Sequence, residues 1–139
     1  RRKCTCKSNC KINIMIQANE LRIGIFVLYN EDNIYCKVLE IDTLGIRVDF
    51  MKNGEIEWVE YDCFSYIPLT HEILEKCGFE MHKTSQLWRK GNFYLHHYLI
   101  SDNEYCFKYS DFKSSSIQSL HQLQNLYFAL TGEELTYKF

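Results

Sequence analysis

The chain has 139 residues and a formal net charge of -2, with 46% apolar and 24% charged residues. This balance is typical of one globular domain, or of one domain with a small appendage, and it excludes a disordered or collagen-like chain. No apolar run approaches the roughly 18 residues that a membrane helix needs, so no membrane partner is expected.

The first 14 residues hold five basic residues and no acid, whereas the rest holds 11 basic and 18 acidic residues. A phosphate-tracking groove needs clustered Lys and Arg, so the acidic body argues against nucleic-acid binding. Cys4, Cys6 and Cys10 are weak candidates for a zinc site, because no fourth ligand lies nearby in the sequence. We expect residues 1–14 to be a flexible or non-native leader outside the fold, with Met15 as the natural start.

The seven cysteines are odd in number, which argues against a secreted disulfide framework. The residues that follow Arg1, Arg2 and Lys3 are polar, so they do not form a secretory signal. The cysteines beyond the leader have apolar neighbours, which predicts small core residues and not activated nucleophiles; they are Cys36, Cys63, Cys77 and Cys106. We therefore expect the protein to reside in a reducing cytoplasm.

Between Leu21 and Tyr66, short apolar runs alternate with polar turns. This pattern predicts four β-strands, at residues 26–29, 34–41, 46–51 and 56–61. Asn53-Gly54 indicates a two-residue type I′ hairpin between the last two strands. Four short strands joined by tight turns suit a small SH3-like β-barrel over residues 15–67.

The expected hairpin register pairs Asp49 with Trp58. Strand alternation then gives the hairpin two faces: Val48, Phe50, Val59 and Tyr61 lie on one, and Asp49, Met51, Ile56 and Trp58 on the other. Aromatic side chains on small barrels can contact ligands or peptides, so Trp58 and Asp49 are candidate binding residues. The alternative is that Trp58 packs beneath the connecting helix.

Residues 68–139 begin with a short helix, expected at residues 69–77. Thr70 is a suitable N-cap, and Gly78 suits the position just after the helix. Strands are expected at residues 87–89, 93–100 and 105–109, in an antiparallel meander whose outward side chains include Tyr94 and Tyr98. His96 and His97 are adjacent on a strand and therefore point to opposite faces, which argues against a shared metal ion.

A second helix is indicated by apolar residues at helical spacing, namely Ile117, Leu120, Leu123, Leu126, Tyr127 and Leu130. Serines at 114–116 offer N-caps, and Gly132 is expected to end the helix. Leu120, Leu123, Tyr127 and Leu130 should be buried against the meander. The opposite face is polar but uncharged, so Gln122 and Gln124 are candidates for a partner surface; the alternatives are a face packed on the barrel unit or a merely solvated one.

The predicted fold class is α+β: an SH3-like barrel unit, a connecting helix, and a β-meander packed by a C-terminal helix. The link around residues 65–70 is short and not flexible in composition. We therefore expect residues 15–67 and 68–139 to pack together as one body.

Three stretches carry a family resemblance: Ala18 to Gly24, Ile67 to Phe79 and Leu120 to Gly132. They resemble an uncharacterised family of small proteins from gut Bacteroidetes and their phages and mobile elements. The resemblance covers about residues 15–135, and it supports Met15 as the start. That family has no established activity, so the resemblance implies only a small accessory protein working in the bacterial cytoplasm.

No glycine-rich phosphate loop and no nucleophile elbow occurs in the sequence. We therefore expect a non-enzymatic binding module, without a cofactor, that engages a protein partner. One alternative is a small-molecule sponge for a nucleotide signal, stacking on Tyr94, Tyr98 or Trp58. A deep aromatic pocket with a basic residue such as Arg89 or Lys90 would favour that alternative. The other is a nucleic-acid-binding small barrel, which a continuous basic stripe would favour.

Overall fold

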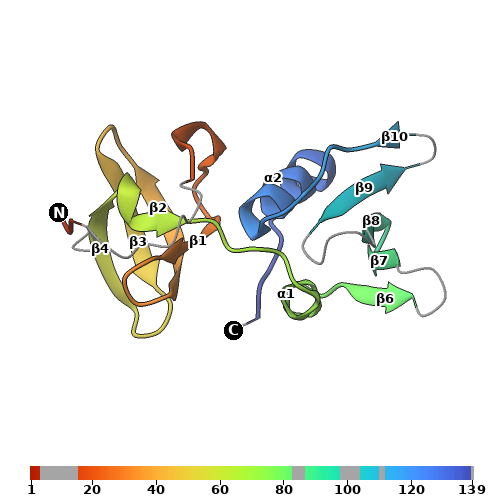
Figure 1. The fold of residues 1–139 in the computed structure, drawn as a ribbon, viewed down its shortest axis with the longest axis horizontal. Coiled ribbons are helices and arrows are strands. Elements are labelled where there is room, and N and C mark those ends of the chain that lie inside the picture. The colour runs from red at the N-terminus through yellow and green to blue at the C-terminus, as the bar shows by residue number, and fades with distance from the viewer. Residues whose placement is uncertain (4–15, 83–86, 98–103, 110–111, 139) are drawn as a thin grey trace. The chain divides into compact units, whose positions relative to one another are not determined.

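The computed structural model describes residues 1–3, 16–82, 87–97, 104–109 and 112–138, and its fold is α+β, as predicted (Figure 1). The chain divides into two compact units, Arg1–Ile67 (unit 1) and Pro68–Phe139 (unit 2). That the two units pack as one body stays a prediction. Among the described residues, no helix is both long enough and apolar enough to cross a membrane.

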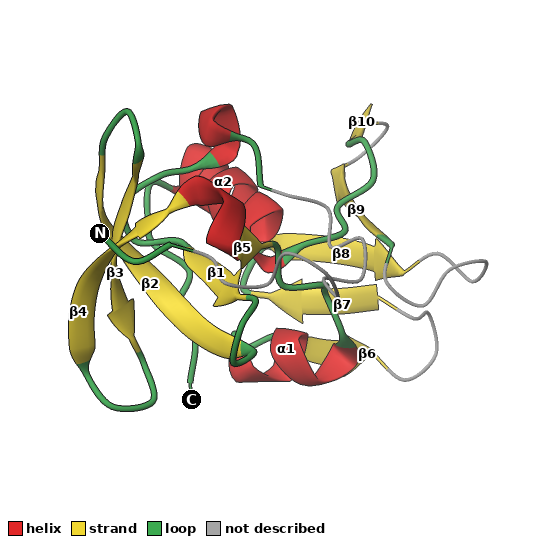
Figure 2. Ribbon diagram, turned by 60° about the vertical axis from the view of Figure 1, so that its left-hand side comes forward, coloured by secondary structure: helices red, strands yellow, loops and turns green. Residues whose placement is uncertain are grey.

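Unit 1 is an antiparallel half-barrel sheet with the strand order β4-β3-β2-β1-β5 (Figure 2). Its strands are β1 (Phe26–Tyr29), β2 (Ile34–Ile41), β3 (Gly45–Phe50), β4 (Glu55–Glu60) and β5 (Phe64–Ser65). Short 3-10 turns, η1 (Ala18–Glu20) and η2 (Tyr61–Cys63), precede β1 and β5. β1 and β2 have the bounds that the sequence predicts, whereas β5 was not expected, because two residues show no periodicity.

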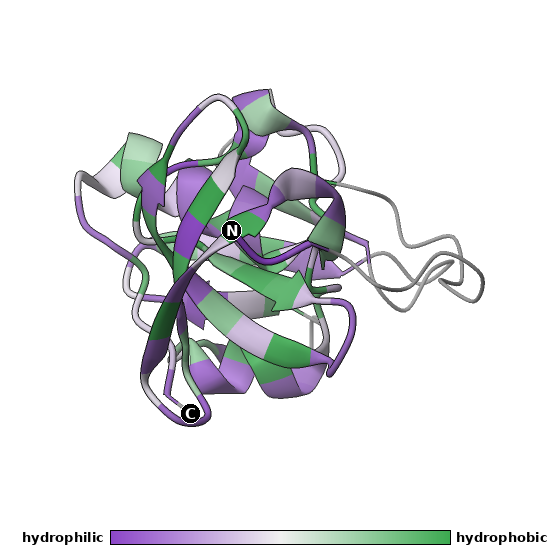
Figure 3. Ribbon diagram, turned by 90° about the vertical axis from the view of Figure 1, so that its left-hand side faces the viewer, coloured by the Kyte–Doolittle hydropathy of each residue, from purple (hydrophilic) through white to green (hydrophobic). Residues whose placement is uncertain are grey.

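Alternation along the strands of unit 1 separates a core side from a solvent side, and Figure 3 shows hydrophobic and hydrophilic residues alternating there. The core includes Val27, Val38, Val48 and Val59, all fully buried. A break in the β2–β3 register between Val38 and Glu40 indicates a β-bulge. A bulge bends its strand and increases the local twist, which helps the sheet to curl around this core.

The predicted register of the β3–β4 hairpin is wrong by two residues. Asp49 pairs with Ile56, and Trp58 pairs with Arg47, because the turn comprises residues 51–54 rather than two residues. Gly54 has the expected positive φ of 70°, but Asn53 does not have the positive φ that a type I′ turn requires. Instead, Asn53 Oδ1 accepts a hydrogen bond from the Glu55 amide, and the Phe50 carbonyl accepts from Gly54.

Unit 2 contains a second antiparallel sheet, in the order β10-β9-β8-β7-β6, and two helices. Its elements are α1 (His71–Lys76), β6 (Glu80–His82), β7 (Leu87–Lys90), β8 (Phe93–His97), β9 (Tyr105–Tyr109), β10 (Phe112–Lys113) and α2 (Leu120–Thr131). The predicted meander is confirmed in β7, β8 and β9. The outer strands β6 and β10 were missed because they are only two or three residues long.

Both helices of unit 2 end where the sequence predicts, but only α1 has the N-cap residue that the sequence predicts. Thr70 caps α1 by accepting from the Ile73 amide, and the Phe79 amide closes its end on the Leu74 carbonyl. Gly132 ends α2 with a left-handed φ of 74°. The N-cap of α2 is Ser119 and not one of the serines at 114–116, since residue 117 is held in a β-bridge.

Candidate functional site

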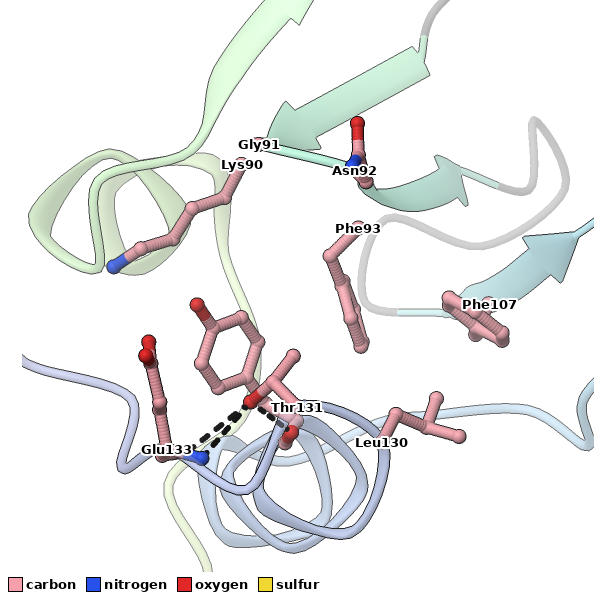
Figure 4. A pocket seen from close by; sticks show the side chains of 9 residues that line it. Lys90, Gly91, Asn92, Phe93, Phe107, Leu130, Thr131 and Glu133 are labelled. Atoms are coloured by element: carbon pink, nitrogen blue, oxygen red, sulfur yellow. Dashed lines mark hydrogen bonds between the residues drawn. The ribbon is translucent and has the colours of Figure 1, made fainter.

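Unit 2 contains an apolar hollow of about 550 Å³ (Figure 4). One wall is the last turn of α2, with Leu130 and Thr131, followed by Glu133. The other wall is the turn between β7 and β8, at residues 90–92. The hollow therefore lies where a helix end and a hairpin turn approach each other.

The hollow exists because the apolar stripe of α2 is not covered along its full length. Leu120 and Leu123 are fully buried and Tyr127 is nearly so, as predicted. Leu130 continues the same stripe one turn later, and the prediction that it is buried is wrong, because 53% of its surface is exposed. An exposed leucine at the end of a buried stripe marks the point where the meander no longer covers the helix.

Three aromatic rings form the floor of the hollow. The Phe93 ring lies 4.7 Å from that of Phe107 and 5.2 Å from that of Tyr127, measured between centroids, and both pairs are tilted. These three side chains are themselves at least nine-tenths buried. Their packing against one another fixes the floor of the hollow in place.

A lysine side chain stands at the rim. Lys90 is half-buried, and its Nζ donates a 2.7 Å hydrogen bond to the Cys77 carbonyl at the end of α1. The same atom lies 5.7 Å from the centre of the Tyr127 ring. No carboxylate of the described residues forms an ion pair with it. An ammonium group has three donors, so two of them remain available for an anion.

The hollow has a charged end and an apolar end. In Figure 4 the Lys90 and Glu133 side chains lie on the left, and Phe107 and Leu130 lie on the right. Asn92 adds a polar amide on the wall formed by the hairpin turn. Such an amphipathic cavity orients a ligand, with its apolar body over the rings and its polar group near Lys90.

Burial lowers the reactivity of two of the cysteines. The described cysteines, Cys36, Cys63, Cys77 and Cys106, are all buried, as predicted for small core residues. Burial raises the pKa of the Cys77 thiol, at the end of α1, to about 12, and that of Cys36 to about 12 as well. A thiol with such a pKa stays protonated at neutral pH and is unreactive.

The candidate residues predicted from sequence do not meet at one place. Trp58 and Asp49 are half-buried on one face of unit 1, where Trp58 lies beneath the guanidinium of Arg1, 5.1 Å from the ring centre. Asp49 has one buried carboxylate oxygen without a hydrogen-bond partner among the described residues. Neither residue contributes to the hollow, which belongs to unit 2.

In unit 2 the predicted residues also lie apart from the hollow. Tyr94 is half-buried on β8 and lines a second, smaller cavity of about 140 Å³ together with Arg89. Gln122 is half-buried, and its side-chain oxygen accepts from the Gln118 amide. Gln124 is only 1% exposed, which corrects the expectation that it belongs to an exposed amide surface. Tyr98 lies outside the described residues, as do Cys4, Cys6 and Cys10.

Sequence reasoning named Lys90 as a basic residue that could serve a pocket, but it missed the aromatic floor. Strand alternation puts Phe93 on the side opposite the outward-facing Tyr94, and Phe93 is indeed buried, but no pattern shows that a core side chain also lines a cavity. The available signal was the length of the α2 stripe, which continues to Leu130 just before the stop at Gly132. Comparison with protein-family models, with curated proteins and with solved structures gave no match.

Proposed function

We propose that this protein is a non-enzymatic binding module and that the hollow in unit 2 holds a small organic anion with a flat apolar body. One observation carries the proposal: the Lys90 ammonium stands at the rim of an aromatic-floored hollow without a carboxylate partner among the described residues. This arrangement meets the condition under which the sequence analysis favours a small-molecule ligand over a protein partner.

The size and lining of the hollow suit a small molecule. Its volume of about 550 Å³ falls within the range of roughly 300–1,000 Å³ that is usual for ligand pockets. A flat ring system can lie against Phe93 and Phe107 and cover the exposed side of Leu130. Removing that apolar surface from water supplies most of the binding free energy.

The charges at the rim favour a single negative charge on the ligand. Lys90 offers two free donors to a carboxylate or sulfonate, and a charge-assisted hydrogen bond is stronger than a neutral one. Glu133 lies at the same end of the hollow and repels a second negative charge. A monoanion therefore fits better than a ligand with several phosphates, which weakens the nucleotide version of the small-molecule hypothesis.

Unit 1 supports a second part of the proposal. Its five short antiparallel strands are in the order β4-β3-β2-β1-β5, with a 3-10 turn just before the last strand. We assign this unit to the SH3-like small barrels on that topology. On the family resemblance of the sequence, we further propose that the protein is a bacterial or phage accessory protein of the cytoplasm.

A fluorescence titration tests the ligand site. The probes are 8-anilinonaphthalene-1-sulfonate, which has a flat apolar body and one negative charge, and N-phenyl-1-naphthylamine, its neutral counterpart. We expect one sulfonate probe to bind per chain. Lys90→Met should weaken the sulfonate probe by about tenfold or more, because a charge-assisted hydrogen bond is lost, and should leave the neutral probe nearly unchanged.

The matched control is Lys108→Met, which removes the same charge from an exposed position on β9. It should leave both titrations unchanged. Leu130→Glu should weaken both probes, since it places a charge at the apolar end. Equal sulfonate affinity in the native chain and in Lys90→Met and Leu130→Glu would contradict the proposal, as would binding of many probes per chain.

A further inference from the structure

Residues 1–3, which the sequence analysis leaves outside the fold, lie along the outer edge of β4, where Arg2 forms an isolated β-bridge. Figure 1 places the N-terminus beside β4. The Arg2 amide donates to the Trp58 carbonyl at 2.8 Å, and the Glu60 amide donates to the Arg2 carbonyl at 3.1 Å. Arg2 and Val59 thereby form a parallel bridge. The outer edge of β4 therefore accepts an extended segment through backbone hydrogen bonds.

The first arginine of this segment is held on one face of the sheet. Both terminal nitrogens of Arg1 bond the Asp42 carboxylate, at 3.1 and 2.5 Å, and the guanidinium lies over the Trp58 ring. Asp42 also accepts from the amides of Leu44 and Gly45, so the turn holds its carboxylate in place. The bond from Arg1, followed by these amides, lowers the pKa of Asp42.

The second arginine is held on the opposite face, since successive residues of an extended segment point to opposite sides. Two nitrogens of Arg2 lie 2.8 Å from the two carboxylate oxygens of Glu57. Its guanidinium also lies 5.0 Å from the centre of the Phe50 ring and 5.6 Å from that of Tyr29. Each arginine thus meets a carboxylate in a two-pronged fork and an aromatic ring.

We infer that this edge of β4 is a binding surface for an extended segment of a partner protein that carries two consecutive arginines, and that residues 1–3 occupy it in cis. The recognition is for guanidinium and not for positive charge alone. Only the planar guanidinium makes two parallel bonds to one carboxylate while stacking on a ring, which a lysine ammonium cannot do.

The cis segment is held weakly enough to exchange. Its side chains and their carboxylate partners are a quarter to two-fifths exposed, and ion pairs at such positions contribute little. Its backbone contributes two hydrogen bonds to β4. A partner must compete with the high effective concentration of a tethered segment, so removal of the cis arginines should strengthen binding in trans.

The test uses the full chain and the blocked peptide acetyl-Arg-Arg-Lys-amide, followed by NMR amide shifts. We expect the double variant Arg1→Gln, Arg2→Gln to bind this peptide at least about tenfold more tightly than the native chain. The amides of Glu57, Trp58 and Glu60 should shift. Adding Glu57→Gln to this double variant should reduce its affinity for the arginine peptide again. The peptide acetyl-Lys-Lys-Lys-amide should bind the double variant much more weakly than the arginine peptide does.

Three outcomes would overturn the inference. The first is that the double variant does not bind the arginine peptide saturably. The second is that the lysine peptide binds equally well, and the third is that the amide shifts lie outside β4. A native chain that forms a concentration-dependent dimer, abolished by Arg1→Gln and Arg2→Gln, would assign the surface to a second copy and not to a different partner. The hollow of unit 2 shares no residue with this surface, so failure here leaves the proposed ligand site untouched.

Discussion

The aromatic rings of the two units have different surroundings. In unit 1, the rings of Phe50 and Trp58 lie against guanidinium groups supplied by the chain itself. In unit 2, Phe93 and Phe107 form the floor of a hollow whose lining includes the charged residues Lys90 and Glu133 at one end. The first surface must be vacated before it can bind anything else, whereas the second is ready for a ligand.

The difference follows from how each sheet ends. In unit 1 residues 1–3 bond to the outer edge of β4, and their guanidinium groups cover the rings of Trp58 and Phe50. In unit 2 the helix α2 continues one turn beyond its buried part, so Leu130 is exposed beside the rings. The hollow beside Leu130 is therefore a candidate binding site.

The largest expected effect is in the core of unit 2. Leu123 is fully buried, so Leu123→Ala should lower the free energy of unfolding by about 2–5 kcal/mol. Leu130→Ala is the matched control, because it makes the same substitution at an exposed position of the same stripe. It should change stability by less than about 0.5 kcal/mol while weakening the sulfonate probe.

Thiol labelling under native conditions shows which unit opens in these variants. Cys77 and Cys106 belong to unit 2, and Cys36 and Cys63 belong to unit 1; all four are buried. If the units unfold separately, Leu123→Ala accelerates labelling of Cys77 and Cys106 only. If all four thiols accelerate together, the units unfold as the single body that the sequence analysis expects.

The next effect is in unit 1, at a glycine that packs against the neighbouring strand. A Cβ atom on Gly45 would lie 2.2 Å from the Val59 carbonyl oxygen, which is backbone and cannot move aside. Gly45→Ala should therefore destabilise unit 1 by about 1–3 kcal/mol, as overpacking does. Denaturant unfolding measures the loss, and an unchanged midpoint would show that β3 and β4 are not paired as described.

A smaller loss is expected at the hairpin turn. Gly54 has a φ of 70° and open space around its Cβ position. Gly54→Val should cost about 1–2 kcal/mol from backbone strain alone. Gly54→Asn is the control, because asparagine tolerates the left-handed region. Equal stability of the two variants would mean that the turn does not need a positive φ.

The smallest effect concerns the pH dependence of the Arg1–Asp42 pair. The folded-state pKa of Asp42 is lowered, so its contribution to stability is present above the ordinary Asp pKa of about 4 and is lost as the pH falls through the folded value. Arg1→Gln should raise the pKa of Asp42 toward its ordinary value. An NMR titration of the carboxyl carbon measures this, and an unchanged titration in the variant would contradict the pairing.

The sequence predicts the fold class well because its elements are periodic. It places β1 and β2 correctly, and it groups Val48, Phe50 and Val59 on one face of the hairpin, which is the buried face despite the wrong register. That error leaves the faces unchanged because side chains alternate with a period of two, and the slip is by two residues. The Asn53-Gly54 pair led to the wrong predicted register, because the chain forms a longer turn that the Asn53 side chain closes.

The candidate site is less predictable from sequence because a cavity depends on where packing stops. Helical spacing groups Leu130 with Tyr127 but does not show that the strands fail to cover it. Gln124 and Gln122 look alike in the sequence, yet only Gln124 is almost completely buried. Arg1 and Arg2 read as part of a polar leader, because no local pattern indicates that they would pair with β4.

The most direct test of the ligand site is an amide chemical-shift map of the full chain as 8-anilinonaphthalene-1-sulfonate is added. The account predicts saturable shifts confined to the walls of the hollow, at Gly91 and Asn92 in the hairpin turn and at Leu130 and Thr131 in α2. Trp58 and Glu60 in unit 1 should not move. Shifts centred on β4, or spread over both units without saturation, would contradict the assignment of the hollow as the binding site.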